Sequence, residues 1–111
     1  MISVDVSLGD RGNLVSASAT GHAGKGKRGE DIVCAAVTVL LRTTLAVLSS
    51  NGVESSADTA GRGSLAFRVT ALREGDIPFL RYAADFLLEG LGSLAREYPD
   101  AVELRVQRAI C

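Results

Sequence analysis

Two side chains that can do chemistry together, His22 and Cys34, lie in one short stretch of the sequence, GHAGKGKRGEDIVCAA, residues 21–36. His22 is the only histidine in the 111-residue chain, and Cys34 is one of two cysteines. A thiolate is a strong nucleophile, and an imidazole accepts and returns protons near neutral pH. The pair therefore points to nucleophilic catalysis by a thiol with a histidine as general base, provided that the fold brings the two together.

The same stretch is also close to a phosphate-binding loop. Gly21, four further residues and then Gly26-Lys27 follow the spacing of that motif, but its next position needs Ser or Thr and is Arg28 here. Four residues also separate Lys27 from Ile32, where the apolar pattern of a helix begins. The mismatch disfavours nucleotide binding.

Taken separately, each of the two reactive residues can be explained without catalysis. A lone histidine after a strand is often a surface residue, and a cysteine in an apolar helix is often a small buried hydrophobe. Taken together, they fit a dyad. We expect the helix to start at Glu30 or Asp31, so that Cys34 lies in its first turn, where unpaired N–H groups and the helix dipole favour a thiolate. The N–H of Cys34, or a neighbouring one, would then stabilise an oxyanion.

Asp31 precedes Cys34 by three positions, which places both on one helical face. It has two possible roles, which the sequence does not separate. Asp31 can orient His22 as a third member of the site, or it can act as the helix N-cap, a position that Asp favours.

The elements that must position these residues follow from periodicity. Apolar residues alternate with polar ones over 2–8 and again over 14–20, which predicts two strands. The turn sequence GDRGN, residues 9–13, joins them as an antiparallel hairpin. Residues 31–50 predict a helix that is apolar nearly all round, so something must cover it: the sheet, the second helix or a partner subunit. Its core stripe is Val33, Val37, Leu40, Leu41, Thr44 and Leu48.

In the second half of the chain, the same kinds of periodicity predict three further strands and a second helix. We expect an edge strand at 53–60, a strand at 64–72 and a last strand at 102–106. Between the last two lies a second helix, which Asp76 can cap and which tolerates Pro78 in its first turn. The order ββαββαβ predicts an α+β, two-layer sandwich: one mixed or antiparallel sheet, with two helices in a layer, forming a single domain over residues 1–111. The buried stripe of the second helix is Leu80, Ala83, Leu87, Leu91, Leu94 and Tyr98.

Composition narrows the class of protein. With 47% apolar residues and a formal net charge of −1, the chain is an ordinary globular protein without general attraction to nucleic acid or anionic membranes. The N-terminus resembles no signal peptide and no charge-free run of eighteen apolar residues exists, so we expect a cytoplasmic protein without a membrane span. Cys34 and Cys111 make no disulfide framework, and no motif calls for a metal or a cofactor. We expect no role for the terminal Cys111.

The motif around the dyad resembles the signature of the ribosomal-processing cysteine protease Prp family, which runs Gly-His-Ala, a glycine-containing loop, then Gly-x-Asp-Ile-Val-Cys-Ala-Ala-Val-Ser. The opening MISVDVS, the order of elements and the REYPD segment are also similar to family members. The matching positions are Gly21, His22, Ala23, Gly24, Gly29, Asp31, Ile32, Val33, Cys34, Ala35, Ala36 and Val37.

This resemblance implies a cysteine endopeptidase with His22 and Cys34 as its catalytic pair. It further implies a substrate, the short N-terminal extension of a large-subunit ribosomal protein, and a homodimeric enzyme. The loop between the catalytic residues would close over the peptide. That substrate loop consists of Gly21, Ala23, Gly24, Lys25, Gly26, Lys27, Arg28 and Gly29.

The chain departs from the family pattern at two places. Thr38 stands where Ser is usual, which keeps a hydroxyl. The segment 25–28 is unusually basic and lacks an aromatic residue. Its charged side chains either contact ribosomal RNA or acidic residues, or are simply solvated at the tip of the loop. The alternative hypothesis is a non-catalytic ribosome-assembly or protein-binding module of the same fold, which would not need both members of the dyad.

Overall fold

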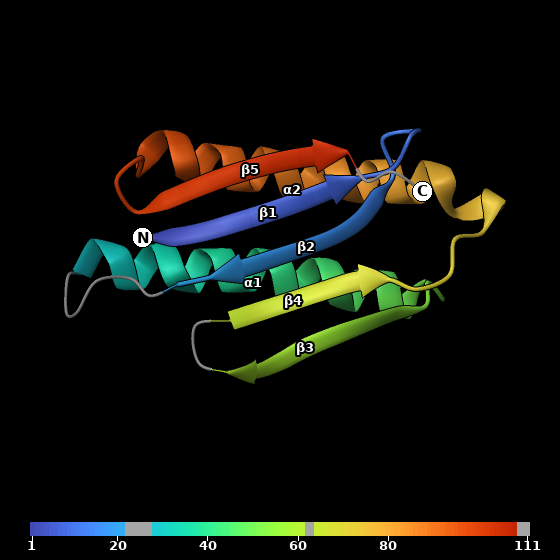
Figure 1. The fold of residues 1–111 in the computed structure, drawn as a ribbon, viewed down its shortest axis with the longest axis horizontal. Coiled ribbons are helices and arrows are strands. Elements are labelled where there is room, and N and C mark those ends of the chain that lie inside the picture. Colours follow the sequence, from blue (N-terminus) through green and yellow to red (C-terminus); the bar gives the residue numbers. More distant parts are fainter. Residues whose placement is uncertain (22–27, 62–63, 109–111) are drawn as a thin grey trace.

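The computed structural model describes residues 1–21, 28–61 and 64–108, without the side chains of 28–31 and 59–61. Within these ranges the chain forms one five-stranded sheet with both helices on one of its faces, so that the other face is open (Figure 1). The predicted α+β, two-layer fold of order ββαββαβ is therefore confirmed. The strands are β1 (Ile2–Leu8), β2 (Leu14–Thr20), β3 (Ser55–Gly61), β4 (Ser64–Val69) and β5 (Val102–Arg108).

The sheet is mixed. Its strand order is β3-β4-β2-β1-β5, and each neighbouring pair is antiparallel except β1 and β5, which run parallel. The predicted hairpin of β1 and β2 is present, with Val4 opposite Ala19 and Val6 opposite Ala17. These side chains lie on the helix side, as the alternation predicts, because successive residues of a strand face opposite sides of a sheet.

Two long helices, α1 (Arg28–Ser50) and α2 (Ile77–Glu97), form the second layer, and a short 3₁₀ helix, η1 (Glu74–Asp76), leads into α2. The predicted stripe of α1 is buried or half-buried along its whole length. The stripe of α2 is buried at Leu80, Leu87 and Leu91, with Ala84 in addition. The core therefore lies between the helices and the inner face of the sheet.

Some predicted boundaries are wrong. Helix α1 begins at Arg28, not at Glu30 or Asp31, so Asp31 is inside the helix and does not occupy its N-cap position. Asp76 does occupy the N-cap position of α2, but its side chain makes no capping hydrogen bond. Strand β4 ends at Val69, because the chain then turns away towards η1.

One finding bears on the expectation about membrane spans. Residues Ile32–Ser50 of α1 are long and apolar enough to cross a membrane when judged by length and composition alone. A helix in the core of a globular protein meets the same criterion. In this fold Val33, Val37, Leu41 and Leu48 of α1 are buried in the core that it shares with the sheet and α2.

Candidate active site

Strand β2 ends and helix α1, which carries Cys34, begins at the same end of the molecule (Figure 1). His22 and residues 23–27 of the substrate loop lie outside the described residues. That the side chains of His22 and Cys34 meet therefore stays a prediction. For Arg28, Gly29 and Asp31 the structure gives the backbone only, which is helical. Gly21 and Cys34 are fully described.

Gly21 follows the last residue of β2 in a conformation that favours glycine. Its φ is +108°, a region that L side chains rarely adopt, and a Cβ atom added there would lie 2.3 Å from the carbonyl oxygen of Met1. The close approach follows from the pairing of β1 with β2, which sets Thr20 opposite Ser3. Gly21 was predicted as a residue of the substrate loop, and its backbone role was not predicted, because the approach to Met1 joins segments far apart in the sequence.

Cys34 is the seventh residue of α1, in its second turn. It is a free cysteine, half-buried, and packs against the core. The thiol is therefore not sealed inside the protein. The expectation that Cys34 lies in the first turn is wrong. The helix dipole acts mainly within the first turn, so it contributes less positive potential at Cys34 than we expected.

The position of Cys34 also bears on the predicted oxyanion hole, whose donor was left open as the N–H of Cys34 or a neighbouring one. In an α-helix only the first four N–H groups lack an acceptor within the helix. With a start at Arg28 these belong to the turn that precedes Cys34, and the N–H of Cys34 itself has an acceptor one turn back. Donors to an oxyanion from this helix must therefore come from the residues before Cys34.

A hydroxyl group holds the backbone at Cys34. Thr38 Oγ1 donates a hydrogen bond of 2.8 Å to the carbonyl oxygen of Cys34. Threonine often bonds the carbonyl four residues back in a helix. The replacement of the usual Ser by Thr at this position thus keeps a hydroxyl that contacts the residue predicted to be the nucleophile.

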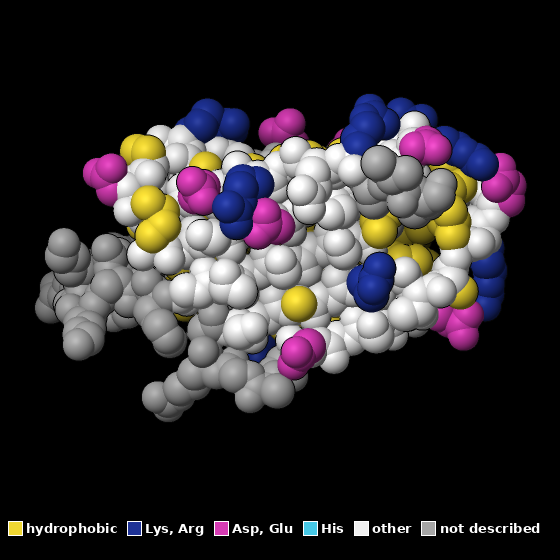
Figure 2. All heavy atoms as spheres, in the orientation of Figure 1, with side chains coloured by type: hydrophobic (Ala, Val, Ile, Leu, Met, Phe, Trp, Pro, Cys, Tyr) yellow, Lys and Arg dark blue, Asp and Glu magenta, His cyan; other side chains and the backbone are white. Residues whose placement is uncertain are grey.

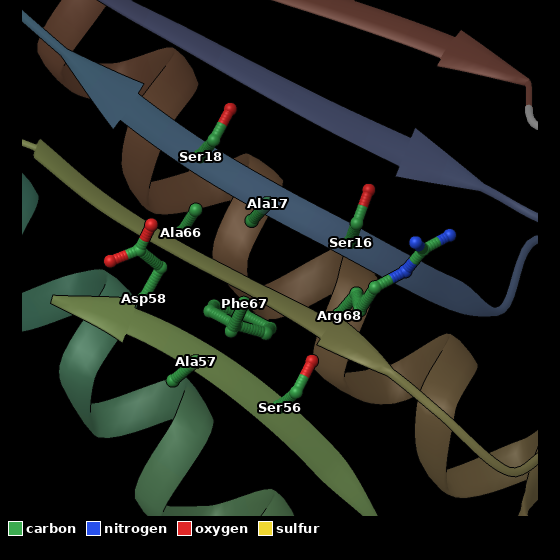
Figure 3. Close-up of a pocket in the computed structure, with 9 residues that line it drawn as sticks. All are labelled: Ser16, Ala17, Ser18, Ser56, Ala57, Asp58, Ala66, Phe67 and Arg68. Carbon is green, nitrogen blue, oxygen red and sulfur yellow. The ribbon is translucent and has the colours of Figure 1, made fainter.

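A second candidate surface lies on the open face of the sheet, over β2, β4 and β3. An open trough of about 350 Å³ is lined largely by small side chains, including Ser16, Ser18 and Ala66. Figure 3 shows Arg68 and Asp58 projecting beside it. Across the whole face, Figure 2 shows blue and magenta side chains interspersed on a largely white surface. The trough offers hydroxyl groups and two charges, but among the described residues it brings together no nucleophile and base.

Comparisons with known proteins bear on this arrangement. The sequence profile of the family described as cysteine protease Prp matches residues 1–103. No curated protein matches the chain by sequence.

Three similar solved structures share the fold. A Streptococcus mutans protein is 27% identical, with a TM-score of 0.80, over 98% of this chain and 96% of its own. The essential ribosomal processing protease Prp from S. aureus in complex with a substrate peptide is 23% identical, with a TM-score of 0.77, over 96% and 99%. The same protease with a covalently linked product peptide is 24% identical, with a TM-score of 0.76, over 96% and 99%. Because the family profile covers nearly the whole chain, this protein belongs to the cysteine protease Prp family.

Proposed function

We propose that this protein is a cysteine endopeptidase that removes a short N-terminal extension from the precursor of a large-subunit ribosomal protein. The observation that carries the proposal is the half-buried free thiol of Cys34, at the end of the molecule where the only histidine follows β2. The S. aureus relatives, which are described as a ribosomal processing protease bound to peptides, support the substrate class. The site of action would be the cytoplasm, where such precursors are made and thiols stay reduced.

The mechanism needs His22 in two roles. The thiolate of Cys34 attacks the scissile carbonyl carbon, and the C–N bond breaks as protonated His22 gives its proton to the leaving amine. The peptide is then held as a thioester. His22 next takes a proton from a water molecule, which attacks the thioester carbon and releases the acid and the thiol. Asp31, three positions before Cys34 on the same helix, would orient the imidazole as a third member of the site.

The glycine-rich loop would supply the peptide-binding surface. Its glycines allow backbone atoms to come close to an extended substrate. The bases Lys25, Lys27 and Arg28 would then meet acidic groups on the precursor.

Cleavage of the precursor is the direct test. Purified protein is mixed with the organism's own precursor, and the new N-terminus is read by mass spectrometry. We expect one defined cleavage, no product with Cys34→Ala, and a loss of about 10²–10⁴-fold in rate with His22→Ala, the usual contribution of general acid–base catalysis. An intact precursor after prolonged incubation with wild-type protein would favour a binding module.

The state of the thiol is tested separately, by alkylation with iodoacetamide near neutral pH. A Cys111→Ser background leaves Cys34 as the only thiol. Since Cys34 lies beyond the first turn of α1, the rate should depend on the imidazole, and His22→Ala should slow it. Equal rates with and without His22 would contradict the dyad.

We also propose that the protein forms a homodimer through the outer face of its helix layer. An apolar groove of about 250 Å³ lies between α1 and α2 there, with Val47, Phe79, Tyr82 and Phe86 among its lining residues. Tyr82 and Phe86 are 79% and 66% exposed, which is unusual for adjacent aromatic side chains of an isolated chain.

Charges beside the groove support self-association. Arg42 lies on α1, and Asp85 and Glu89 lie on α2; all three are exposed, and none forms an ion pair with another described residue. A second copy related by a two-fold axis would bring Arg42 of one protomer towards the acidic side chains of its partner, twice in each dimer.

A further inference from the structure

A small cavity lies under the turn between β1 and β2, away from the predicted catalytic residues. Its volume is about 170 Å³. Figure 1 shows this turn at the opposite end of β2 from the start of α1. The seven residues of β2 separate the two ends by roughly 20 Å, at about 3.3 Å per residue. The residues that line it include Gly9, Arg11, Asn13, Leu14, Leu72 and Ile77.

The cavity combines an apolar floor with one buried amide. Leu14 and Ile77 are buried, while Leu72 is 56% exposed and adds apolar surface that a ligand can reach. Asn13 is only 4% exposed. Among the residues that the structure describes, no hydrogen bond reaches its side chain. Buried polar groups are normally paired, so an amide with two donors and an acceptor is left available at this cavity.

The turn holds the amide of Asn13 in place. A Cβ atom at Gly9 would lie 2.5 Å from Asn13 Oδ1 and 2.7 Å from Nδ2, so the side chain occupies the space that any other residue would need. The backbone N–H of Gly9 donates a 2.8 Å hydrogen bond to the carbonyl oxygen of Asn13. The side chain of Arg11, in the same turn, forms an ion pair with Glu74 and so links the turn to η1. The amide of Asn13 is therefore packed closely against the backbone of Gly9.

The size of the cavity limits its ligand. Sites for small molecules and cofactors usually enclose about 300–1,000 Å³, which is more than this cavity offers. A single branched apolar side chain fits the volume, and the amide of Asn13 matches the N–H and C=O of a peptide backbone beside it. We propose that this cavity is a docking site for an extended peptide segment, which inserts one leucine-like side chain and hydrogen-bonds Asn13 through its backbone.

The location defines what the site would do. At roughly 20 Å from Gly21, it cannot hold the residues next to the scissile bond. If the proposed function is right, the segment belongs to the body of the precursor, and docking raises its effective concentration at the catalytic end. Short peptides that contain only the cleavage sequence would not use the site.

The first test measures binding alone and is independent of catalysis. N-acetyl-leucine-N-methylamide is titrated into ¹⁵N-labelled Cys34→Ala protein, with N-acetyl-glycine-N-methylamide as the control probe. We expect saturable shifts of the amide signals of Gly9, Asn13, Leu72 and Ile77 with the leucine probe only. Leu72→Asp, at an exposed position that should not disturb folding, should abolish them. The proposal is wrong if no saturable shifts occur, or if they persist unchanged in Leu72→Asp.

The second test measures use of the site. Leu72→Asp should lower kcat/KM for the full precursor by about fivefold or more, the effect of losing a well-packed anchor, and leave a short cleavage peptide unaffected. Equal values for the precursor, or a parallel loss with the short peptide, would overturn the docking role. Failure of the wild-type protein to cleave either substrate would instead reject the proposed function, while the binding test would still stand.

Discussion

Gly21, directly before the predicted catalytic histidine, has an unusual backbone conformation. It has no room for a side chain because the carbonyl of Met1 lies where a Cβ would be, and its φ of +108° is strained for any other residue. His22 is the next residue in the chain. We therefore expect the path of the chain after β2 to depend on this glycine.

We predict that Gly21→Ala lowers both stability and activity. Backbone strain alone costs about 1–3 kcal/mol, and the contact with Met1 adds to it. Urea unfolding should show the loss of stability. The value of kcat/KM should also fall under conditions where the variant is folded, because displacement at Gly21 moves His22.

Gly52 provides the matched control. Its φ is +78°, so Gly52→Ala carries a similar backbone strain, but nothing lies within 4 Å of an added Cβ. It follows the far end of α1 and should lose some stability while it keeps wild-type kcat/KM. Equal activity of the folded Gly21 and Gly52 variants would show that Gly21 does not position the histidine.

At the scale of elements, α1 and α2 approach each other closely at Gly90 of α2, which has no side chain. A Cβ atom on Gly90 of α2 would lie 2.9 Å from a methyl carbon of Leu40 on α1. The missing side chain lets Leu40 pack against α2. This contact fixes how α1, which carries Cys34, lies relative to α2.

Two glycine substitutions in α2 should therefore differ in effect. Alanine is favoured over glycine in a helix by about 1 kcal/mol. Gly92→Ala should realise much of this gain, because its Cβ approaches only the flexible end of exposed Arg96, at 3.2 Å. Gly90→Ala must displace Leu40 and should be less stable than Gly92→Ala by about 1 kcal/mol or more.

Chemical denaturation of the two variants decides the point. Truncation of Leu40 in the Gly90→Ala background provides the double-mutant test, since it removes the atoms that the new methyl group meets. If Gly90→Ala is as stable as Gly92→Ala, the contact with Leu40 does not constrain the helices.

For the molecule as a whole, the exposed aromatic groove determines the expected assembly. A two-layer fold covers only one side of its helices, and α1 and α2 both place apolar side chains on the other. Burying Tyr82 and Phe86 against a second copy would remove that surface from water.

We predict that Phe86→Glu converts a dimer into a monomer. Sedimentation velocity at several concentrations would measure the change, and the charge acts because it would be buried at the interface. Val106→Glu is the control, since Val106 is another exposed apolar residue, on β5 at the edge of the sheet. A wild-type protein that is monomeric at all concentrations, or a Phe86→Glu variant that remains dimeric, would contradict the proposed interface.

Local patterns determined much of the fold and the choice of candidate residues. Alternation predicted β1 and β2 and their pairing, and the apolar periodicity predicted the buried stripe of α1. Cys34 and His22 were identified from residue types and from the motif around them. These features depend on neighbours in the sequence, whose period and chemistry are visible without a structure.

Tertiary contacts decided the rest. The start of α1 at Arg28 includes Gly29, a poor helix former, so local propensity placed the boundary too late and Cys34 in the wrong turn. The parallel pairing of β5 with β1 and the close approach of Gly21 to Met1 join residues that no local pattern relates. A sequence specifies which side chains seek burial, but which distant segments meet depends on the packing of the whole chain.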